Sequence, residues 1–395
     1  MSARSPEPAT ARPAVTALFG SQIREVANAG LGDPDVLAFW FGEPDEVTPS
    51  FVRDAAARSL ANGETFYTHN FGIPELREAL AAYGSRLHRP VDVGRVAVTA
   101  SGMSALMLAV QALVGPADRV VAVTPLWPNL TEIPKILSGN VVRVPLVFTR
   151  AGWTLDLDRL LSALTPDTRA VMINSPNNPT GWTIDAPTQQ AVLAHCRRHG
   201  IWIIADDVYE RLYFGAKSSV APSFLAIADP AERLISTNSF SKAWLMTGWR
   251  LGWMIAPEAL MADLGKLIEY NTSCSPVFVQ RAGVAAIVDG EATVAHTRER
   301  LRHARDSLVS RLAKLHEIEI ASPPGAMYAF FRVEGVHDSL DFCKRLVTKV
   351  KLGLAPGSAF GPEGDGFVRW CFAADDARLA EGIDRFACFL RAERA

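Results

Sequence analysis

The sequence predicts an α/β protein in which helices sandwich a mainly parallel seven-stranded sheet, with a smaller α+β domain beside it. Seven short runs rich in β-branched residues follow one another through the middle of the chain, with helical patterns between most of them. This alternation is typical of a parallel sheet covered on both faces. A charged helical segment from about Gly290 then leads into a region with further strand patterns. Because 395 residues exceed one ordinary core, two domains are expected.

Before the sheet, the chain shows an arm and several helical patterns. Residues 1–17 are rich in Pro, Ala and Ser, and we interpret them as a flexible N-terminal arm. A helix is predicted over 18–29 and a short strand over 36–41, and two more helices begin near Ser50 and Pro74. The seven sheet strands are then predicted at 96–99, 120–124, 141–145, 170–174, 201–205, 234–237 and 251–255.

The link between the last two of these strands is too short for a full crossover, so one of the two is expected to run antiparallel. Three strands of the smaller region are predicted near 318–321, 328–333 and 367–372. The predicted domains are therefore 48–292 for the large α/β domain, and 18–47 together with 293–395 for the small one.

Composition excludes several classes of protein. Hydrophobic residues make up 49% of the chain, and the formal net charge is -2, which gives no footprint for nucleic acid or an anionic membrane. No apolar run is long enough to span a bilayer, and the N-terminus lacks the apolar centre of a signal peptide. Five scattered cysteines without a C-x-x-C pair indicate a reducing compartment and no metal site. We expect a cytoplasmic protein with no nucleic-acid or membrane partner.

Polar and small residues follow several predicted strands, where ligands of open α/β sheets bind. Ser101, Gly102 and Met103 open a helix after the first strand, so their backbone N–H groups could hold an anion; an ordinary helix cap is the alternative. The segment 175–181, with two asparagines and two prolines, is either a plain turn or a rigid loop that aims the Asn178 amide at a ligand.

Two acidic residues follow the apolar strand 201–205. A carboxylate at such a position is costly to bury unless it is paired with a cation, and a protonated pyridine nitrogen is one such cation. Asp206 is the candidate for this role, whereas Asp207 could equally be a helix cap.

Lys242 lies in an apolar segment, three residues after Ser239 and eight before Arg250. Most lysines merely solvate a surface. A desolvated lysine near positive charge, however, loses its proton readily and can form a Schiff base with an aldehyde. An arginine fork and a serine hydroxyl nearby suit a phosphate.

Together these segments resemble the class I/II aminotransferases, which are pyridoxal-phosphate enzymes of the aspartate aminotransferase superfamily and have fold type I. The resemblance runs from about Gly42 to Phe372. It is carried by S-P-N-N-P-T-G at 175–181, D-D-V-Y at 206–209, S-F-S-K at 239–242 with Arg250, and Y-x-x-x-x-G-I-P-E-L-R at 67–77.

The resemblance implies roles for the residues around the cofactor ring. Lys242 would hold pyridoxal 5'-phosphate through a Schiff base and then shuttle a proton. Asp206 would pair with the ring nitrogen, keeping it protonated so that the ring can accept electrons. Asn178 and Tyr209 would hydrogen-bond the phenolic oxygen, and Trp127 would stack on the ring, although a core aromatic is the alternative reading of that tryptophan.

Further roles follow for the phosphate and the substrate. The phosphate would be held by Ser101, Gly102, the Met103 backbone, Ser239 and Arg250. Tyr67 would reach the phosphate of the neighbouring subunit, which implies a homodimer.

Arg369 would bind the substrate carboxylate and Gly42 would allow the substrate to approach closely, with Trp127 and Asn178 also bordering it. The implied reaction is a ping-pong transfer of an amino group between an L-amino acid and a 2-oxo acid.

The sequence also departs from the family pattern. Leu130 stands where aspartate enzymes often carry a histidine behind the ring-nitrogen carboxylate. His69 is expected either to line the pocket or to lie in an exposed loop. The bulky pair Trp40 and Phe41 is expected to narrow the side-chain pocket or to make it more aromatic. No second arginine for a distal carboxylate is identifiable, so the amino donor stays open, with aromatic or aliphatic donors among the candidates.

Two other functions share these residues. A C–S β-lyase would use the same cofactor contacts, and its release of pyruvate and ammonia would distinguish it from a transaminase. A non-catalytic module that senses pyridoxal phosphate is the third reading. The presence of the lysine and of both proposed anchors, Asp206 and Arg250, argues against it.

Overall fold

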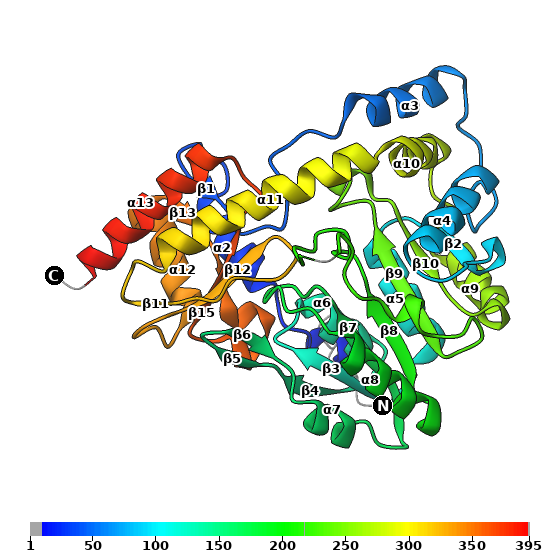
Figure 1. The fold of residues 1–395 in the computed structure, drawn as a ribbon, viewed down its shortest axis with the longest axis horizontal. Helices are drawn as coiled ribbons and strands as arrows, with labels where there is room; N and C mark the ends of the chain where they lie inside the picture. Colours follow the sequence, from blue (N-terminus) through cyan, green and yellow to red (C-terminus); the bar gives the residue numbers. More distant parts are fainter. Residues whose placement is uncertain (1–9, 217, 394–395) are drawn as a thin grey trace, which may run out of the picture.

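A seven-stranded sheet is the centre of the computed structural model, which describes residues 10–216 and 218–393 (Figure 1). The strand order is β2-β10-β9-β8-β7-β3-β4. The strands are β2 (Val96–Thr99), β3 (Arg119–Thr124), β4 (Asn140–Pro145), β7 (Thr168–Asn174), β8 (Trp202–Asp206), β9 (Leu234–Ser239) and β10 (Gly252–Ile255). β10 runs antiparallel to both of its neighbours, whereas the other pairs are parallel. The predicted α/β fold and the predicted antiparallel strand are therefore confirmed.

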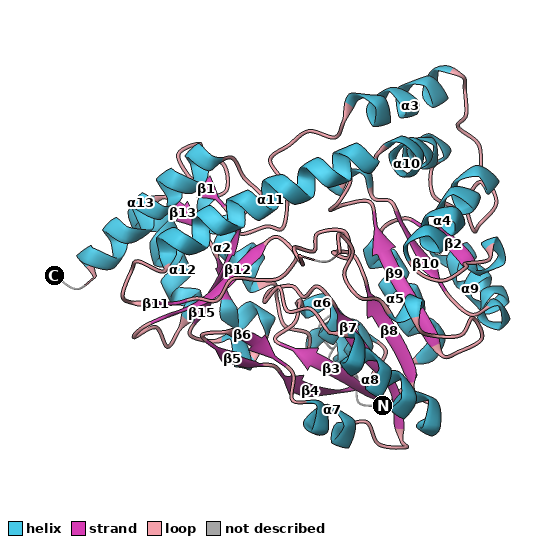
Figure 2. Ribbon diagram, viewed as in Figure 1, coloured by secondary structure: helices cyan, strands magenta, loops and turns pink. Residues whose placement is uncertain are grey.

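Both faces of this sheet are buried, because successive strand residues contribute to different apolar clusters. Val120 and Ala122 pack with α5, α6 and α9, whereas Val121 and Val123 belong to the cluster that includes α4, α8 and α10. Figure 2 shows the strands with helices around them. The helices of this part are α3 (Ser50–Ala61), α4 (Pro74–Leu87), α5 (Gly102–Leu113), α6 (Pro128–Ile136), α7 (Leu157–Ala163), α8 (Ala186–His199), α9 (Glu258–Asn271) and α10 (Val277–Asp289).

The long charged helix α11 (Glu291–Leu312) leads from this sheet to a second one (Figure 1). The second sheet has the order β11-β12-β15-β14 and is antiparallel. Its strands and helices are β11 (Ile318–Glu319), β12 (Tyr328–Val333), β14 (Ala355–Pro356), β15 (Phe367–Cys371), α12 (Ser339–Val350) and α13 (Asp376–Ala392). The domain boundaries given above stay a prediction.

The segment before the large sheet lies against this second region. β1 (Leu37–Ala38) pairs in parallel with β13 (Leu352–Gly353), and α2 (Gln22–Gly30) contacts α12. The remaining elements are the hairpin β5 (Val147–Thr149) with β6 (Gly152–Thr154), and the 3-10 turns η1 (Val93–Arg95), η2 (Phe224–Ala226), η3 (Thr247–Trp249), η4 (Gly357–Phe360) and η5 (Pro362–Gly364).

The predicted arm, 1–17, falls partly outside the described residues, which begin at residue 10. Where it is described, the arm is not simply extended: α1 (Pro13–Thr16) forms a short helix with proline at its start. The Arg12 guanidinium donates to the carbonyl of Ile136 in α6. This hydrogen bond holds the arm against the large domain's helices.

The topology places one edge of the large sheet beside the second sheet. All its strands except β10 point the same way, so their carboxyl ends, at Thr99, Asn174, Asp206 and Ser239, meet at one edge. The backbone N–H of Trp127, just beyond this edge, donates to the carbonyl of Asn178. The residues predicted to carry chemistry follow these strand ends.

Candidate active site

One cavity of about 280 Å³ lies at this edge and collects most of the predicted site residues. They are Gly42, Gly102, Met103, Trp127, Asn178, Asp206, Tyr209, Ser239, Lys242, Arg250 and Arg369. Phe41, which was expected to border the side-chain pocket, also lines the cavity. The lining residues to which the sequence gave no role are Ile23, Leu106, Asn174, Val208, Ser241 and Tyr328. Ser101 and Tyr67 are not part of this lining.

Lys242 projects its amine into the cavity from the loop between β9 and β10. The ammonium donates a hydrogen bond to the carbonyl of Gly42. Burial, with help from the guanidinium groups of Arg369 and Arg250, lowers the pKa of Lys242 to about 8 against the opposing effect of Cys371 and Glu43. A substantial neutral fraction at physiological pH makes this amine a nucleophile toward an aldehyde.

Asp206 ends β8 and faces the amine's cavity with few partners. Within the described part of the chain, its carboxylate accepts one hydrogen bond, from the Val208 N–H at 3.3 Å. Burial, together with the neighbouring Asp207 carboxylate, raises the pKa of Asp206 to about 7. A buried carboxylate so poorly satisfied is costly unless a cation joins it, and a protonated pyridine nitrogen fits that requirement.

The same burial predicts a pH-dependent stability effect. Asp206 has a folded-state pKa of about 7, above the ordinary value of 3.8, so the fold favours its protonated form. Its ionisation therefore costs the ligand-free fold little below pH 4 and progressively more as pH rises through 7. We expect Asp206→Asn to raise Tm of the ligand-free protein by about 2–4 °C at pH 8 and by less at pH 5.

Differential scanning calorimetry of the variant at both pH values measures this effect. Asp54→Asn, at an exposed helical position, is the matched control and should leave Tm unchanged. A variant no more stable than the parent at pH 8 would show that Asp206 is not a destabilising charge in the ligand-free fold.

Asp207 is not the helix cap that the sequence also allowed. No helix starts at this position, and the Asp207 carboxylate instead accepts hydrogen bonds from the hydroxyls of Ser223 at 3.2 Å and Ser236 at 2.6 Å. These partners lie in other strands and turns, so no local pattern could reveal them. Leu130, which replaces the histidine found in aspartate enzymes, is fully buried in the apolar cluster of α6.

Arg369 in β15 enters the cavity from the second sheet. Its Nη1 donates to Asn178 Oδ1 at 2.9 Å, and its Nη2 donates to the carbonyl of Trp40. Its Nε is buried and has no hydrogen-bond partner among the described residues. Arg369 as a whole lines the cavity, and a guanidinium placed there suits the carboxylate of a substrate.

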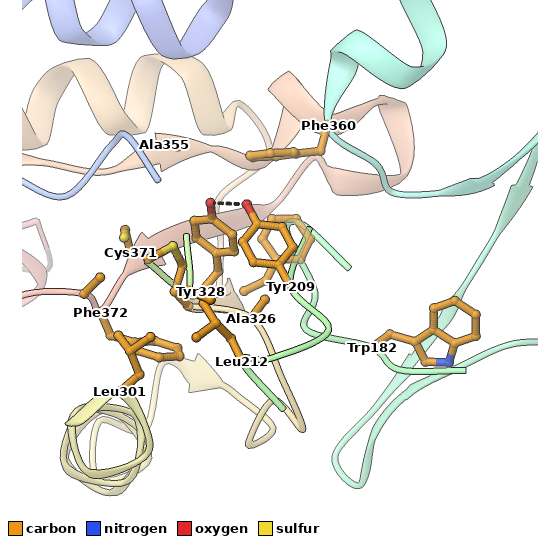
Figure 3. Close-up of a cluster of buried hydrophobic side chains, with 14 of the residues drawn as sticks. Trp182, Tyr209, Leu212, Leu301, Ala326, Tyr328, Ala355, Phe360, Cys371 and Phe372 are labelled. Carbon is orange, nitrogen blue, oxygen red and sulfur yellow. Dashed lines mark hydrogen bonds between the residues drawn. The ribbon is translucent and has the colours of Figure 1, made fainter. Parts of the chain in front are cut away.

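Tyr328 is one of the polar site residues that the sequence did not reveal. Its hydroxyl lies 2.7 Å from that of Tyr209, and the two rings face each other edge to face (Figure 3). The guanidinium carbon of Arg369 lies 4.4 Å from the Tyr328 ring centroid. A tyrosine at the start of β12 has the sequence pattern of an ordinary strand residue. Its place in the site is visible only from the way the second sheet lies beside the first.

The structure gives a reason for glycine at position 42 other than access for a substrate. A Cβ at this position would lie 1.9 Å from the Tyr328 hydroxyl oxygen. We expect Gly42→Ala to displace Tyr328 and lower kcat/KM about 10²-fold, because small misplacements around a reacting centre cost that much. Gly20→Ala, where a Cβ meets nothing within 4 Å, is the control. Steady-state kinetics measure both variants. A kcat/KM of Gly42→Ala equal to that of the parent would mean that Tyr328 moves aside without consequence.

An anion site lies where α5 begins. Gly102 leaves the helix N-terminus open: a Cβ there would lie 2.9 Å from Ser239 Cβ. The hydroxyls of Ser239 and Ser241 are 2.8 Å apart, and they line the same cavity as Arg250. The Ser101 hydroxyl accepts from the Ser104 N–H at 3.0 Å and so caps the helix. Backbone donors, hydroxyls and a guanidinium together suit a phosphate.

The loop containing Tyr67 lies outside the cavity. Tyr67 is 90% exposed and the preceding Phe66 is 83% exposed. His69 is also exposed, and its Nδ1 accepts from the Phe71 N–H at 3.1 Å. His69 therefore corresponds to the exposed-loop alternative of the sequence reading rather than to a pocket residue.

A buried amine of lowered pKa, a carboxylate suited to a pyridinium and an adjoining phosphate site define a pyridoxal-phosphate enzyme of fold type I. Residues 34–386 match the family Aminotransferase class I and II. The chain is 36% identical to an aspartate aminotransferase of Thermotoga maritima, over 90% of this chain and 92% of that protein. It is 33% identical to an aspartate aminotransferase of Pyrococcus horikoshii, over 95% of each.

A solved structure shows the same likeness in three dimensions. A Thermus thermophilus aspartate aminotransferase mutant is 31% identical and superimposes with a TM-score of 0.89, covering 96% of this chain and 99% of that one. The chain belongs to the class I and II aminotransferases, and it is a pyridoxal-phosphate-dependent transaminase acting on amino acids and 2-oxo acids. The comparisons give no support to the lyase alternative.

Two further observations bear on partners. No helix in the described residues is long and apolar enough to cross a membrane. In the same part of the chain, no group of three or more His, Cys, Asp or Glu side chains could hold a metal ion.

Proposed function

We propose that Lys242 is the residue through which this transaminase binds its cofactor and moves the substrate proton. When bound, pyridoxal phosphate supplies an aldehyde that condenses with amines and a protonated ring that accepts the electron pair from a broken Cα–H bond. The Lys242 amine would hold the cofactor's aldehyde carbon and, once free, would take the proton from the substrate Cα and deliver it to that carbon. Its burial and its pKa of about 8 carry this proposal.

The proposed ring contacts come from three strand ends. Asp206 pairs with the ring nitrogen and thereby gains the cation that its burial calls for. Asn178 and Tyr209 hold the phenolic oxygen, while Trp127 lies against the ring. This assignment is supported by all four side chains lining one cavity with Lys242.

The proposed phosphate contacts lie at the start of α5. Gly102 and Met103 offer backbone N–H groups, and Ser239 and Arg250 offer a hydroxyl and a guanidinium. The Ser101 hydroxyl accepts from the Ser104 N–H and so caps the helix, and its own O–H is proposed to donate to the phosphate.

Arg369 is proposed to bind the α-carboxylate of the amino acid and of the 2-oxo acid. Its position in the cavity supports this role. Gly42, Trp127 and Asn178 border the substrate in this arrangement. An arginine fork fixes the orientation of a carboxylate, which places the substrate Cα beside Lys242.

The functional unit is proposed to be a homodimer in which Tyr67 reaches the phosphate bound by the other subunit. The exposure of Tyr67 (90%) and of the neighbouring Phe66 (83%) supports a surface that a second chain covers. The five free cysteines support a reducing compartment, which we propose to be the cytoplasm.

The visible spectrum of the cofactor-loaded protein tests this function. Adding single L-amino acids should convert the band of the bound pyridoxal form into that of the pyridoxamine form, and a 2-oxo acid should restore it. A band that persists while pyruvate and ammonia accumulate would identify a lyase. If pyridoxal phosphate gives no bound band, the proposed site is wrong.

A further inference from the structure

Two buried tyrosine hydroxyls meet in the cavity, and they come from different sheets. Tyr209 follows β8 of the large sheet, whereas Tyr328 begins β12 of the second sheet. Their oxygens lie 2.7 Å apart, and Figure 3 shows the two hydroxyls directed toward one another. Both side chains line the cavity that contains Lys242. This hydrogen bond therefore connects the two sheets beside the proposed cofactor ring.

The neighbours of Tyr328 fix the position of its hydroxyl. A Cβ at Gly42 would lie 1.9 Å from the hydroxyl oxygen, so the backbone at this glycine lies close against it. On another side, the Arg369 guanidinium carbon lies 4.4 Å from the Tyr328 ring centroid, which is within reach of a cation–π contact. All of these contacts are made within one chain, so they do not depend on what a second chain adds to the site.

The number of protons on the two hydroxyls restricts how they can bond. Burial raises the pKa of Tyr209 and of Tyr328 above the ordinary value, so both hydroxyls stay protonated. Their shared hydrogen bond uses one of the two protons, and the other is left for a third acceptor. An anionic phenolic oxygen of the cofactor is such an acceptor. If Tyr209 donates to that oxygen, its own oxygen must accept from Tyr328.

We propose that Tyr328 is a positioning residue that acts through Tyr209: its hydroxyl donates to Tyr209 and directs the Tyr209 proton toward the phenolic oxygen of the cofactor. This inference rests on the proposed function, in which Tyr209 holds that oxygen. Hydrogen bonds in a chain polarise one another, so the Tyr328 hydroxyl strengthens the bond that Tyr209 makes. A better stabilised phenolic anion attracts less strongly the proton on the Lys242 nitrogen attached to the cofactor, so the pKa of that nitrogen falls.

The test is a pH titration of the visible band of the cofactor-loaded protein, which reports the pKa of the attached Lys242 nitrogen. Tyr328→Phe removes the hydroxyl and keeps the ring. We expect this spectroscopic pKa to rise by about 0.5, because the net contribution of one hydrogen bond has about that effect. The other titratable groups that face the two hydroxyls are Asp206, Cys371 and Arg369, and the substitution leaves all three in place.

Tyr213→Phe is the matched control, because Tyr213 is half-buried in the same segment as Tyr209 but does not line the cavity. Its spectroscopic pKa should equal that of the parent. An unchanged pKa in Tyr328→Phe would show that the hydroxyl does not influence the ring, and a lowered pKa would show that Tyr209 donates to Tyr328 instead. Either result overturns the inference, whereas an unmodified protein without a visible band overturns the proposed function.

A double variant separates an effect through Tyr209 from a direct contact with the cofactor. Tyr209→Phe should raise the spectroscopic pKa at least as much as Tyr328→Phe does. Adding Tyr328→Phe to Tyr209→Phe should cause no further change, because the two hydroxyls act in series. A further rise in the double variant would show that Tyr328 reaches the cofactor independently, which contradicts the inference.

The kinetic consequence should appear in kcat rather than in KM. Tyr328→Phe is expected to lower kcat about 2- to 10-fold, which corresponds to the net contribution of one hydrogen bond. KM for the amino donor should stay at the parental value, because the ring that lies against Arg369 is retained. A raised KM with an unchanged kcat would assign the hydroxyl to substrate binding and overturn the inference.

Discussion

Lys242→Ala is expected to lower turnover by about 10⁴-fold or more, because it removes both the covalent anchor of the cofactor and the base that moves the proton. The fold should survive, since the lysine side chain faces the cavity and its packing contribution is small. Bound cofactor should remain measurable, because the phosphate site and Asp206 are untouched. Steady-state transamination assays on purified protein measure the loss.

The control for this substitution is Lys266→Ala, on the exposed face of α9, whose side chain is 71% exposed. It should retain parental rates. Adding a small primary amine such as methylamine should restore part of the activity lost in Lys242→Ala, since the missing group is a base. Near-parental rates in Lys242→Ala without added amine would refute the assigned role.

Arg369→Ala is expected to raise KM for the amino donor about 10²-fold or more, because the substrate carboxylate would be left without its partner in a buried site. The KM of Arg369→Lys should lie between those of the parent and of Arg369→Ala, since lysine keeps the positive charge but lacks the planar fork. The contrast between the two variants separates charge from geometry. Initial-rate kinetics over a wide donor concentration range measure both.

Arg302→Ala, in the exposed face of α11, is the matched control for the loss of an arginine. Its KM should equal that of the parent. The Arg369 variants also lose the hydrogen bond to Asn178, so their cofactor spectra should be recorded alongside. An unchanged KM in Arg369→Ala would move the carboxylate site to another residue.

The large sheet could be predicted because its signals are local. Each strand is a short β-branched run, and the short link holding Lys242 predicts that one of the two strands it joins is antiparallel, which in the structure is β10. Asp206 and Asn178 were likewise predictable, since the carboxyl ends of parallel strands meet at one edge. The order of strands and helices along the chain is enough to place these two residues at the same edge.

The remaining site residues depend on how the second sheet meets the first. Tyr328 and Ile23 enter the cavity from β12 and from α2, and nothing in their local patterns distinguishes them from core residues. Asp207 shows that a local pattern can also suggest the wrong role. Its acidic side chain after a strand suggested a helix cap, but its carboxylate accepts hydrogen bonds from two serine hydroxyls that are distant in sequence.

The central claim is that one buried lysine, Lys242, binds the cofactor covalently. Borohydride reduction of the cofactor-loaded protein converts the carbon–nitrogen double bond into a stable secondary amine, and peptide mass spectrometry then locates it. The account predicts one pyridoxyl-phosphate adduct per chain, on the peptide that contains Lys242, and none in Lys242→Ala. An adduct on another lysine, or a protein that binds the cofactor without any adduct, would contradict it.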